Sequence, residues 1–215
     1  MNGDDHYTYP GSGGVLINLL GLRSSADLDE ALNDFATIEW AALRREPLPD
    51  RFDFAQLQDV HRRLFAAVYP FAGELRDVDV QAGGTGIAYC RPEFLVEQIE
   101  KEFQRLEDDD WLYGRDLRDF AEGLADHWGE ITALHPFRDG NTRSQSAFVT
   151  MLANRAGFTL RWSEMDVDTL RSLRLEAVAH SSRRLTEYLE SHLRPSAAPE
   201  ESETRPFRFG RPERS

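Results

Sequence analysis

Nine consecutive residues, 135–143, bring together a titratable base, a carboxylate, a glycine-containing turn and a cation. The base is His135, whose imidazole suits the removal of a proton from a hydroxyl group at neutral pH. Asp139 offers the carboxylate oxygens that Mg²⁺ prefers, and the phosphate oxygens of a nucleotide, with water, would complete the coordination shell. This combination indicates the transfer of a phosphate-containing group.

The second half of the stretch is expected to bind anions. Gly140, Asn141 and Thr142 lead into a predicted helix, whose first N–H groups are unpaired and carry the positive end of the helix dipole. Asn141 is a candidate N-cap of that helix. Arg143, one turn in, would direct a guanidinium at phosphate oxygens. Phe137 is interpreted as a core residue that anchors the loop.

Each of these residues also has an ordinary structural interpretation. A lone histidine usually packs or lies on the surface, an aspartate here could cap the following helix, and an arginine on a helix is usually solvated. A Gly-Asn pair before a helix is also typical of plain turns. The interpretation as a site depends on all of these residues falling within one short stretch.

Amphipathic helices must hold this loop in place. Apolar residues spaced three and four positions apart, with capping and stop residues at the ends, predict an all-α bundle. The helix before the loop is predicted from about Asp116 to Leu134, and the helix after it from about Thr142 to Ala156, with Gly157 at its end. The other predicted helices cover about 24–46, 53–68, 92–106, a stretch that begins at Ser163 or Asp166, and 182–193.

One β signal is present, and it indicates a small hairpin. Apolar and polar residues alternate from Leu75 to Tyr89, and Gly83-Gly84 would form the turn. A lone hairpin has an unpaired edge, to which an extended peptide can add as a further strand. The hairpin is therefore a candidate surface for binding another protein.

The chain is expected to form one domain over residues 1–194, including an N-terminal extension. Residues 195–215 are expected to be a disordered tail, because they are rich in Pro, Glu, Ser and Arg and contain few core-forming side chains.

Composition argues against several functions. A net charge of −13 over 215 residues disfavours direct binding of nucleic acid, because an acidic surface repels the phosphate backbone. No run of about 18 apolar residues is present, so no membrane span is expected. Cys90 is the only cysteine, and the first 14 residues are polar and acidic, so we expect a cytoplasmic protein without disulfides.

Histidines outside the stretch are expected to have structural roles. His127 precedes Trp128 on the helix before the loop. Trp128 is interpreted as a core residue, whereas His127 could be exposed or could support the site, and an ordinary structural role is favoured. His61, His180 and His192 have no spacing to acidic residues that would indicate a metal site.

The stretch 135–143 resembles the signature of the Fic family, His-Pro-Phe-x-(Asp/Glu)-Gly-Asn-Gly-Arg. Supporting segments occur in the same order as in the family. Phe71-Ala72-Gly73 with Arg76 resembles the segment before the family's hairpin, and residues 84–89 resemble its flap. The opening resembles the bacterial toxin branch of the family through Tyr9, Pro10, Gly11, Leu16, Asn18 and Gly21.

The resemblance implies a Fic-type helical bundle with a hairpin flap, and transfer of AMP from ATP to a hydroxyl group of a target protein. His135 would be the general base, and Asp139 would hold Mg²⁺ on the phosphates. The flap would bind the target as an added strand. The residues implied in nucleotide binding are Phe137, Gly140, Asn141, Thr142 and Arg143 in the motif, and Thr85, Gly86, Ile87 and Ala88 in the flap.

Two positions depart from the family pattern. Thr142 stands where the family usually has glycine, and its β-branched side chain disfavours a positive φ. Ser146 stands where a second arginine is common, which affects anchoring of the γ-phosphate. Two alternatives therefore remain at this point: a related transferase that moves another nucleotide or phosphate group, or a weakened nucleotide- or peptide-binding module.

Many Fic proteins carry an inhibitory helix with the pattern (Ser/Thr)-x-x-x-Glu-(Gly/Asn). Residues 186–190 have the spacing from Thr186 to Glu190, but Ser191 follows, and the segment is interpreted as part of a structural helix. The N-terminal region has no match. The resemblance therefore implies the class of toxins whose inhibitory helix comes from a separate small antitoxin protein.

Overall fold

The computed structural model describes residues 5–196. Helices dominate it, in agreement with the predicted all-α class. They are α1 (Ser25–Leu43), α2 (Phe54–Phe65), α3 (Pro92–Asp108), α4 (Leu117–Leu134), α5 (Asn141–Arg155), α6 (Val167–Ala179) and α7 (Arg183–His192), with short 3₁₀ turns at Asp110–Leu112 and Trp162–Glu164.

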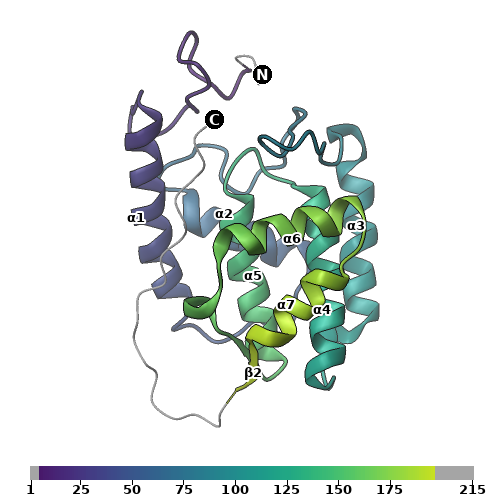
Figure 1. Ribbon diagram of the computed structural model, residues 1–215. Helices are drawn as coiled ribbons and strands as arrows, with labels where there is room; N and C mark the ends of the chain where they lie inside the picture. The colour runs from purple at the N-terminus through teal and green to yellow at the C-terminus, as the bar shows by residue number, and fades with distance from the viewer. Residues whose placement is uncertain (1–4, 197–215) are drawn as a thin grey trace.

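The bundle is organised around α4, which packs against α3, α5, α6 and α7. In Figure 1, α1 and α3 lie at opposite sides of the molecule, α5 lies between them, and α6 and α7 cross in front. Trp128 and Phe120 of α4 are completely buried, as the sequence predicted. The motif loop, residues 135–140, connects the end of α4 directly to the start of α5, so both of its ends are fixed by packed helices.

Side-chain caps explain where four of the helices begin. Ser24, Asp53, Asp116 and Asp166 each accept a hydrogen bond from the backbone N–H three residues later, and so satisfy a donor that the helix leaves unpaired. Of the two predicted starting points for α6, Asp166 is the cap. Ser163 lies in the preceding 3₁₀ turn.

The strands differ from the sequence-based expectation. The two named strands are β1 (Phe158–Leu160) and β2 (Leu193–Pro195), which pair antiparallel with Phe158 opposite Pro195. The predicted hairpin at 75–89 contains a single bridge, between Gln81 and Ala88. The pairing is short because both ends of this segment bond elsewhere: the Arg76 N–H donates to the Pro136 carbonyl and the Cys90 N–H to the Ala133 carbonyl.

The predicted tail falls almost entirely outside the described residues. Its first position, Pro195, is the last residue of β2, and the Ser196 N–H donates to the Gly157 carbonyl at 2.8 Å.

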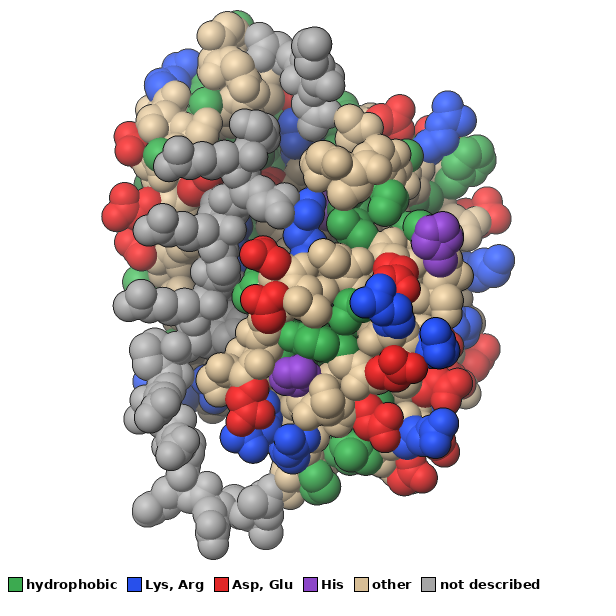
Figure 2. All heavy atoms as spheres, in the orientation of Figure 1, with side chains coloured by type: hydrophobic (Ala, Val, Ile, Leu, Met, Phe, Trp, Pro, Cys, Tyr) green, Lys and Arg blue, Asp and Glu red, His purple; other side chains and the backbone are tan. Residues whose placement is uncertain are grey.

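Acidic and basic side chains are interspersed on the face formed by α6 and α7 (Figure 2), where Arg184 pairs with Glu176 at 2.6 Å. Among residues 5–196, no helix has both the length and the apolar character needed to cross a bilayer.

Candidate active site

His135 occupies the C-cap of α4 in a left-handed backbone conformation, with φ 44° and ψ 59°. This conformation costs an L-residue about 1–2 kcal/mol, so other contacts must enforce it. It turns the imidazole off the helix and against the flap, where the Tyr89 ring stacks on it with a centroid separation of 3.8 Å. The side chain is half-buried and lies at the junction of α4, the flap and the motif loop.

Arg76 enforces that conformation. Its buried guanidinium donates to the carbonyls of His135 at 2.7 Å, Leu134 at 3.2 Å and Val78 at 2.7 Å, and also to the carbonyl of Cys90. Carbonyls at the end of a helix have no partner within the helix and carry the negative end of its dipole, so a cation satisfies both requirements. The family-like Arg76 therefore acts as a structural clamp, which joins the flap to the end of α4.

His61 holds the middle of the loop from α2. Its Nδ1 accepts a hydrogen bond from the Gly73 N–H at 2.9 Å, so the ring proton is on Nε2, which donates to the Asp139 carbonyl at 2.8 Å. Burial lowers the pKa of His61 to about 4, which keeps the ring neutral. Sequence reasoning found no role for His61, because both partners are distant in the sequence.

Asn141 closes the loop from within, and the prediction that it is the N-cap of α5 was wrong. Gly140, with φ 80°, is the cap, and Asn141 is the first helical residue. The Asn141 side chain accepts from the Phe137 N–H at 3.0 Å and donates to the Phe137 carbonyl at 2.7 Å. Phe137 is buried, as expected for a core residue, and its ring packs on His61.

Asp139 is held so that part of its carboxylate stays available. One oxygen, Oδ2, accepts a hydrogen bond from the Tyr69 hydroxyl at 2.8 Å, and the side chain is half-buried. Burial and the nearby Asp139 charge raise the pKa of Tyr69, so its hydroxyl stays a donor. A single oriented carboxylate of this kind fits a Mg²⁺ ion whose remaining ligands are phosphate oxygens and water.

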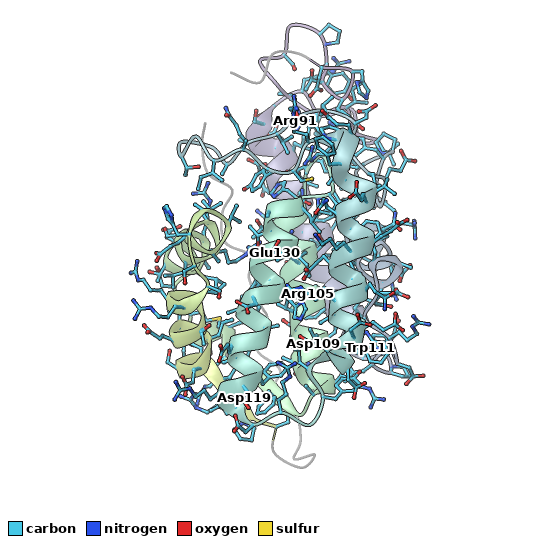
Figure 3. The ribbon with its side chains drawn as sticks, turned by 90° about the vertical axis from the view of Figure 1, so that its right-hand side faces the viewer. Arg91, Arg105, Asp109, Trp111, Asp119 and Glu130 are labelled. Atoms are coloured by element: carbon cyan, nitrogen blue, oxygen red, sulfur yellow. The ribbon has the colours of Figure 1, made fainter. Side chains whose placement is uncertain are left out.

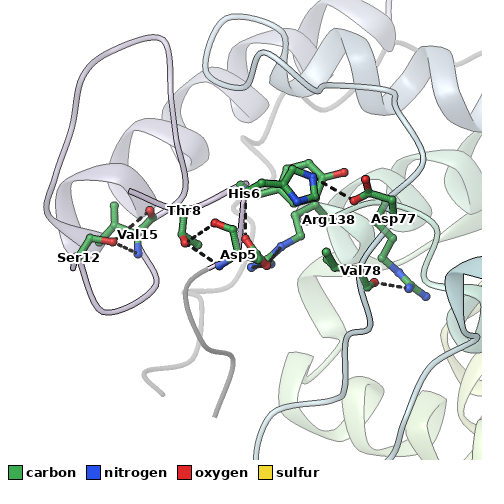
Figure 4. A network of polar contacts seen from close by, with 10 residues as sticks. Asp5, His6, Thr8, Ser12, Val15, Asp77, Val78 and Arg138 are labelled. Carbon is green, nitrogen blue, oxygen red and sulfur yellow. Dashed lines mark hydrogen bonds and ion pairs between the residues drawn. The ribbon is translucent and has the colours of Figure 1, made fainter. Parts of the chain in front are cut away.

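Arg138, the variable position of the motif, points away from this carboxylate toward the N-terminal segment. Its guanidinium pairs with Asp5 at 3.0 Å, and the neighbouring His6 pairs with Asp77 at 3.1 Å, as Figure 4 shows. The N-terminal segment is thus attached both to the motif loop and to the start of the flap.

The start of α5 contains the residues that were expected to bind anions. Thr142 is exposed and lies inside the helix with a right-handed backbone, so the predicted conflict with a positive φ does not arise. Arg143 is half-buried, and its Nη2 donates to Asn33 Oδ1 at 3.0 Å. Ser146 is buried, and its carbonyl accepts from the Thr150 hydroxyl.

Helix α1 also reaches this site, which the sequence did not indicate. Asn33 contacts Arg143, and Asp29 lies close enough to Asp139 and Arg143 to interact with both charges. Burial and repulsion by Asp139 raise the pKa of Asp29, and Arg143 opposes the shift. The contact is long-range, because Asn33 and Arg143 are 110 residues apart in the sequence.

The electrostatic environment keeps His135 uncharged. Burial is the largest cause that lowers the pKa of His135, followed by the positive charges of Arg174 and Arg76, while the Thr132 carbonyl opposes the shift. Its Nδ1 is buried and makes no hydrogen bond with the described part of the chain. The half-buried ring therefore has Nε2 as the nitrogen that can serve a substrate.

The flap residues form an exposed turn beside His135. Thr85, Gly86 and Ala88 are exposed and Ile87 is half-buried. The Ala82 N–H donates to Ile87 and the Tyr89 N–H to Val80, so these bonds point inward, and Ala88 between them directs its N–H outward. The structure thus brings the predicted flap next to the base, while Thr85 bonds within the turn itself.

A separate hollow of about 260 Å³ lies near the other end of α4, between α3 and α4. Figure 3 shows Arg105, Asp109 and Asp119 on this side of the molecule. His127 is buried there between Glu102 at 2.7 Å and Asp109 at 3.0 Å, so it is not exposed and its side chain pairs away from the motif loop. His127 lines the hollow and lies about two helical turns from His135. Among the charged lining residues, Asp109 also pairs with Arg115 at 3.2 Å.

Comparisons with known proteins find a matching family and several relatives. The model of the Fic/DOC family matches residues 51–153. Protein adenylyltransferase VbhT of Bartonella schoenbuchensis is 33% identical over 175 residues, which is 81% of this chain and 36% of that protein. The probable protein adenylyltransferase Fic of Escherichia coli K12 is 32% identical over 164 residues, 76% of this chain and 80% of that protein.

Among solved structures, the BepC protein of Bartonella tribocorum with bound AMPPNP superimposes with a TM-score of 0.81 at 25% identity. The match covers 89% of this chain and 97% of that one.

We expect Gly140→Ala to destabilise the protein more than Gly157→Ala. Both glycines have left-handed backbones, which cost alanine about 1–2 kcal/mol. A Cβ at Gly140 would also lie 2.4 Å from Phe65 Cε2, whereas a Cβ at Gly157 meets nothing within 4 Å in the described chain. Overpacking should add ~1–3 kcal/mol to the first variant, measured by urea unfolding. Equal losses for the two variants would contradict this account of the loop.

Protonation of His61 should destabilise the fold in acid. Because its folded pKa of about 4 lies below the ordinary value of about 6.5, the unfolded chain binds the proton more tightly. The contribution of His61 to the free energy of unfolding is complete above about pH 6.5 and is lost as the pH falls through 4, on the order of 3 kcal/mol. Urea unfolding between these pH values should show a weaker pH dependence for His61→Gln, and an unaltered one for the exposed control His180→Gln.

Proposed function

Because the chain belongs to the Fic/DOC family and is a protein adenylyltransferase, we propose that His135 removes the proton from a target hydroxyl as its oxygen attacks the α-phosphorus of ATP. The new bond joins AMP to the target oxygen. The bond from the α-phosphorus to the bridging oxygen of the β-phosphate breaks, and pyrophosphate leaves.

The observation that carries this proposal is the placement of the His135 imidazole. Its left-handed backbone, the Arg76 clamp and the stacked Tyr89 ring fix it at the edge of the flap, with Nδ1 inward. A base needs a free nitrogen and a neutral ring at the working pH, and the lowered pKa of His135 provides the neutral ring. No other histidine described here combines these features.

We propose that the start of α5 binds the phosphates of ATP. The N–H groups of Asn141, Thr142 and Arg143 are the unpaired first donors of the helix, and Arg143 adds a guanidinium. Gly140 permits the close packing of the loop against the Phe65 ring, and Phe137 supports the loop from the core. Because Ser146 is buried and uncharged, Arg143 carries the cationic contact with the triphosphate.

Asp139 would hold Mg²⁺ through its carboxylate, whose orientation Tyr69 fixes. When bound, the ion supplies positive charge that stabilises the phosphate oxygens during transfer. The protein itself contributes the oriented Asp139 carboxylate, which lies beside the start of α5.

The flap would bind the target through its outer edge, with Thr85, Gly86, Ile87 and Ala88 near the nucleotide. The exposed Ala88 backbone offers the hydrogen-bonding groups that an extended target segment needs. Its closeness to Tyr89, which stacks on His135, would place a hydroxyl of that segment near the base.

We further propose that the chain is a cytoplasmic toxin whose activity is restrained by a small antitoxin protein that supplies an inhibitory helix. The internal candidate, 186–190, lies in α7, which packs against α4 and α6 and is tied to α6 through Arg184 and Glu176. A helix from a partner would instead contact Arg143 beside α1, where Asn33 and Asp29 of this chain lie close to the guanidinium.

Adenylyl transfer can be tested with labelled ATP. Protein incubated with a bacterial lysate, Mg²⁺ and α-labelled ATP should label a target, and γ-labelled ATP should not, because the α-phosphate is the group retained. His135→Ala should reduce labelling at least about 100-fold, since a positioned base contributes that much. Mass spectrometry of the target should show the addition of one AMP group.

The control is His180→Ala, which removes an exposed histidine away from the motif and should label normally. If the γ-label were transferred instead, the reaction would be phosphoryl transfer, and the proposal of adenylyl transfer would be wrong. Nucleotide binding without labelling would identify a binding module.

Ala88→Pro should weaken target binding selectively. Proline removes the outward N–H of Ala88 without removing the inward bonds of Ala82 and Tyr89. Loss of one backbone hydrogen bond predicts a rise of about fivefold in the KM for the target, with the KM for ATP unchanged. Ala88→Ser keeps the N–H and is the matched comparison. If the proline variant kept its KM for the target, binding along this edge would be ruled out.

A further inference from the structure

Arg174, on α6, is a buried cation whose charge no acidic side chain neutralises. It is 4% exposed, and no carboxylate among residues 5–196 forms an ion pair with it. Neutral groups hold it instead: Nε and Nη2 donate to the Thr132 hydroxyl at 3.1 and 2.8 Å, and Nη2 also donates to the side-chain carbonyl of Gln145. Its guanidinium lies over the Trp128 ring, 4.8 Å from the centroid.

A buried charge of this kind is costly and is normally paired. Burial lowers the pKa of Arg174 to about 10, so the group still carries its charge at neutral pH. The groups that orient it come from α4 and α5, the two helices that hold the motif loop. The fold therefore maintains a fixed positive charge between these helices and α6.

That charge lies close to the base. Thr132, which binds Arg174, is three residues before His135, about one helical turn along the chain. The charged and titratable groups that act on the imidazole are Arg174 from α6, Arg76 from the segment before the flap, and Tyr89 from the flap, whose ring is stacked on it. Arg76 is already occupied by four carbonyls, whereas Arg174 has only neutral side-chain partners.

We propose that Arg174 is a positioning residue for adenylyl transfer, whose fixed charge keeps His135 in its neutral, basic form while the nucleotide is bound. The inference rests on the function proposed above. ATP brings several negative charges next to His135, and negative charge favours the protonated imidazole, which cannot accept a proton. A buried cation behind the ring opposes that effect, and its low-dielectric surroundings make the opposition strong.

The effect of Arg174 on the pKa of His135 has the direction that this role requires. After burial, the Arg174 charge is the largest cause that lowers the pKa of His135. It also acts on Tyr89, the ring stacked on the imidazole, whose own pKa burial raises.

The test is the protonation of His135 measured by NMR, together with the pH dependence of kcat/KM. In Arg174→Met, which keeps an apolar contact with Trp128 but removes the charge, both midpoints should rise on the order of one pH unit. Activity should then fall several-fold at pH values near the wild-type midpoint and remain within about twofold of wild type near pH 8. A purely structural role would instead lower activity at every pH without moving the midpoints.

Arg184→Met is the matched control, because it also removes one arginine, here an exposed residue of α7 that pairs with Glu176 of α6. The midpoints should not move in this variant. Arg174→Lys retains the charge and should keep the midpoint near that of wild type. An unshifted midpoint in folded Arg174→Met overturns the proposal.

The wild-type protein gives a second test that needs no variant. With AMPPNP and Mg²⁺ bound, the His135 NMR midpoint should stay below about 6.5, and a higher midpoint overturns the proposal. The NMR measurement requires no turnover. A wild-type protein that fails to transfer AMP would therefore remove the proposed function, while comparison of the wild-type and Arg174→Met titrations would still decide whether Arg174 controls the charge of His135.

Discussion

The structure depends on the left-handed residue at the end of α4. A helix that ends inside a bundle leaves carbonyl groups without partners, and Arg76 collects those of Leu134 and His135 together with two from the flap. The same interaction turns the chain, exposes one side of the imidazole and brings the flap beside it. The positions of the His135 imidazole, of the start of α5 and of the flap therefore follow from how one helix ends.

Two titratable side chains near the end of α4 are each expected to keep one protonation state. His61 must stay neutral, because it accepts from Gly73 with one nitrogen and donates to Asp139 with the other. Arg174 must stay charged, and neutral partners hold it without weakening its field. The neutral His61 ring thus helps to fix the shape of the loop, and the charged Arg174 lowers the pKa of His135.

The sequence predicted those features that depend on near neighbours. Helices α4 and α5 and the caps Ser24, Asp53 and Asp166 follow from local spacing, and the motif itself lies in nine residues. Contacts between distant segments were not predictable from one sequence, such as the β1–β2 pair or the approach of α1 to Arg143.

The flap and Arg174 show why pattern alone was insufficient. Alternation at 75–89 indicated a hairpin, but its ends bond to Pro136 and Ala133 rather than to each other, which shortens the pairing to one bridge. Arg174 follows the buried Leu170 by four residues and so lies on the same face of α6. A charge on the apolar side of a helix was therefore a signal available in the sequence. Its meaning required the position of Thr132 one turn from His135.

The two anchored ends of the flap have a mechanical consequence. Backbone bonds from Arg76 to Pro136 and from Cys90 to Ala133 fasten both roots of the flap to the residues on either side of His135. Because both of these hydrogen bonds end next to His135, a displacement of the flap would also move the backbone that carries the imidazole.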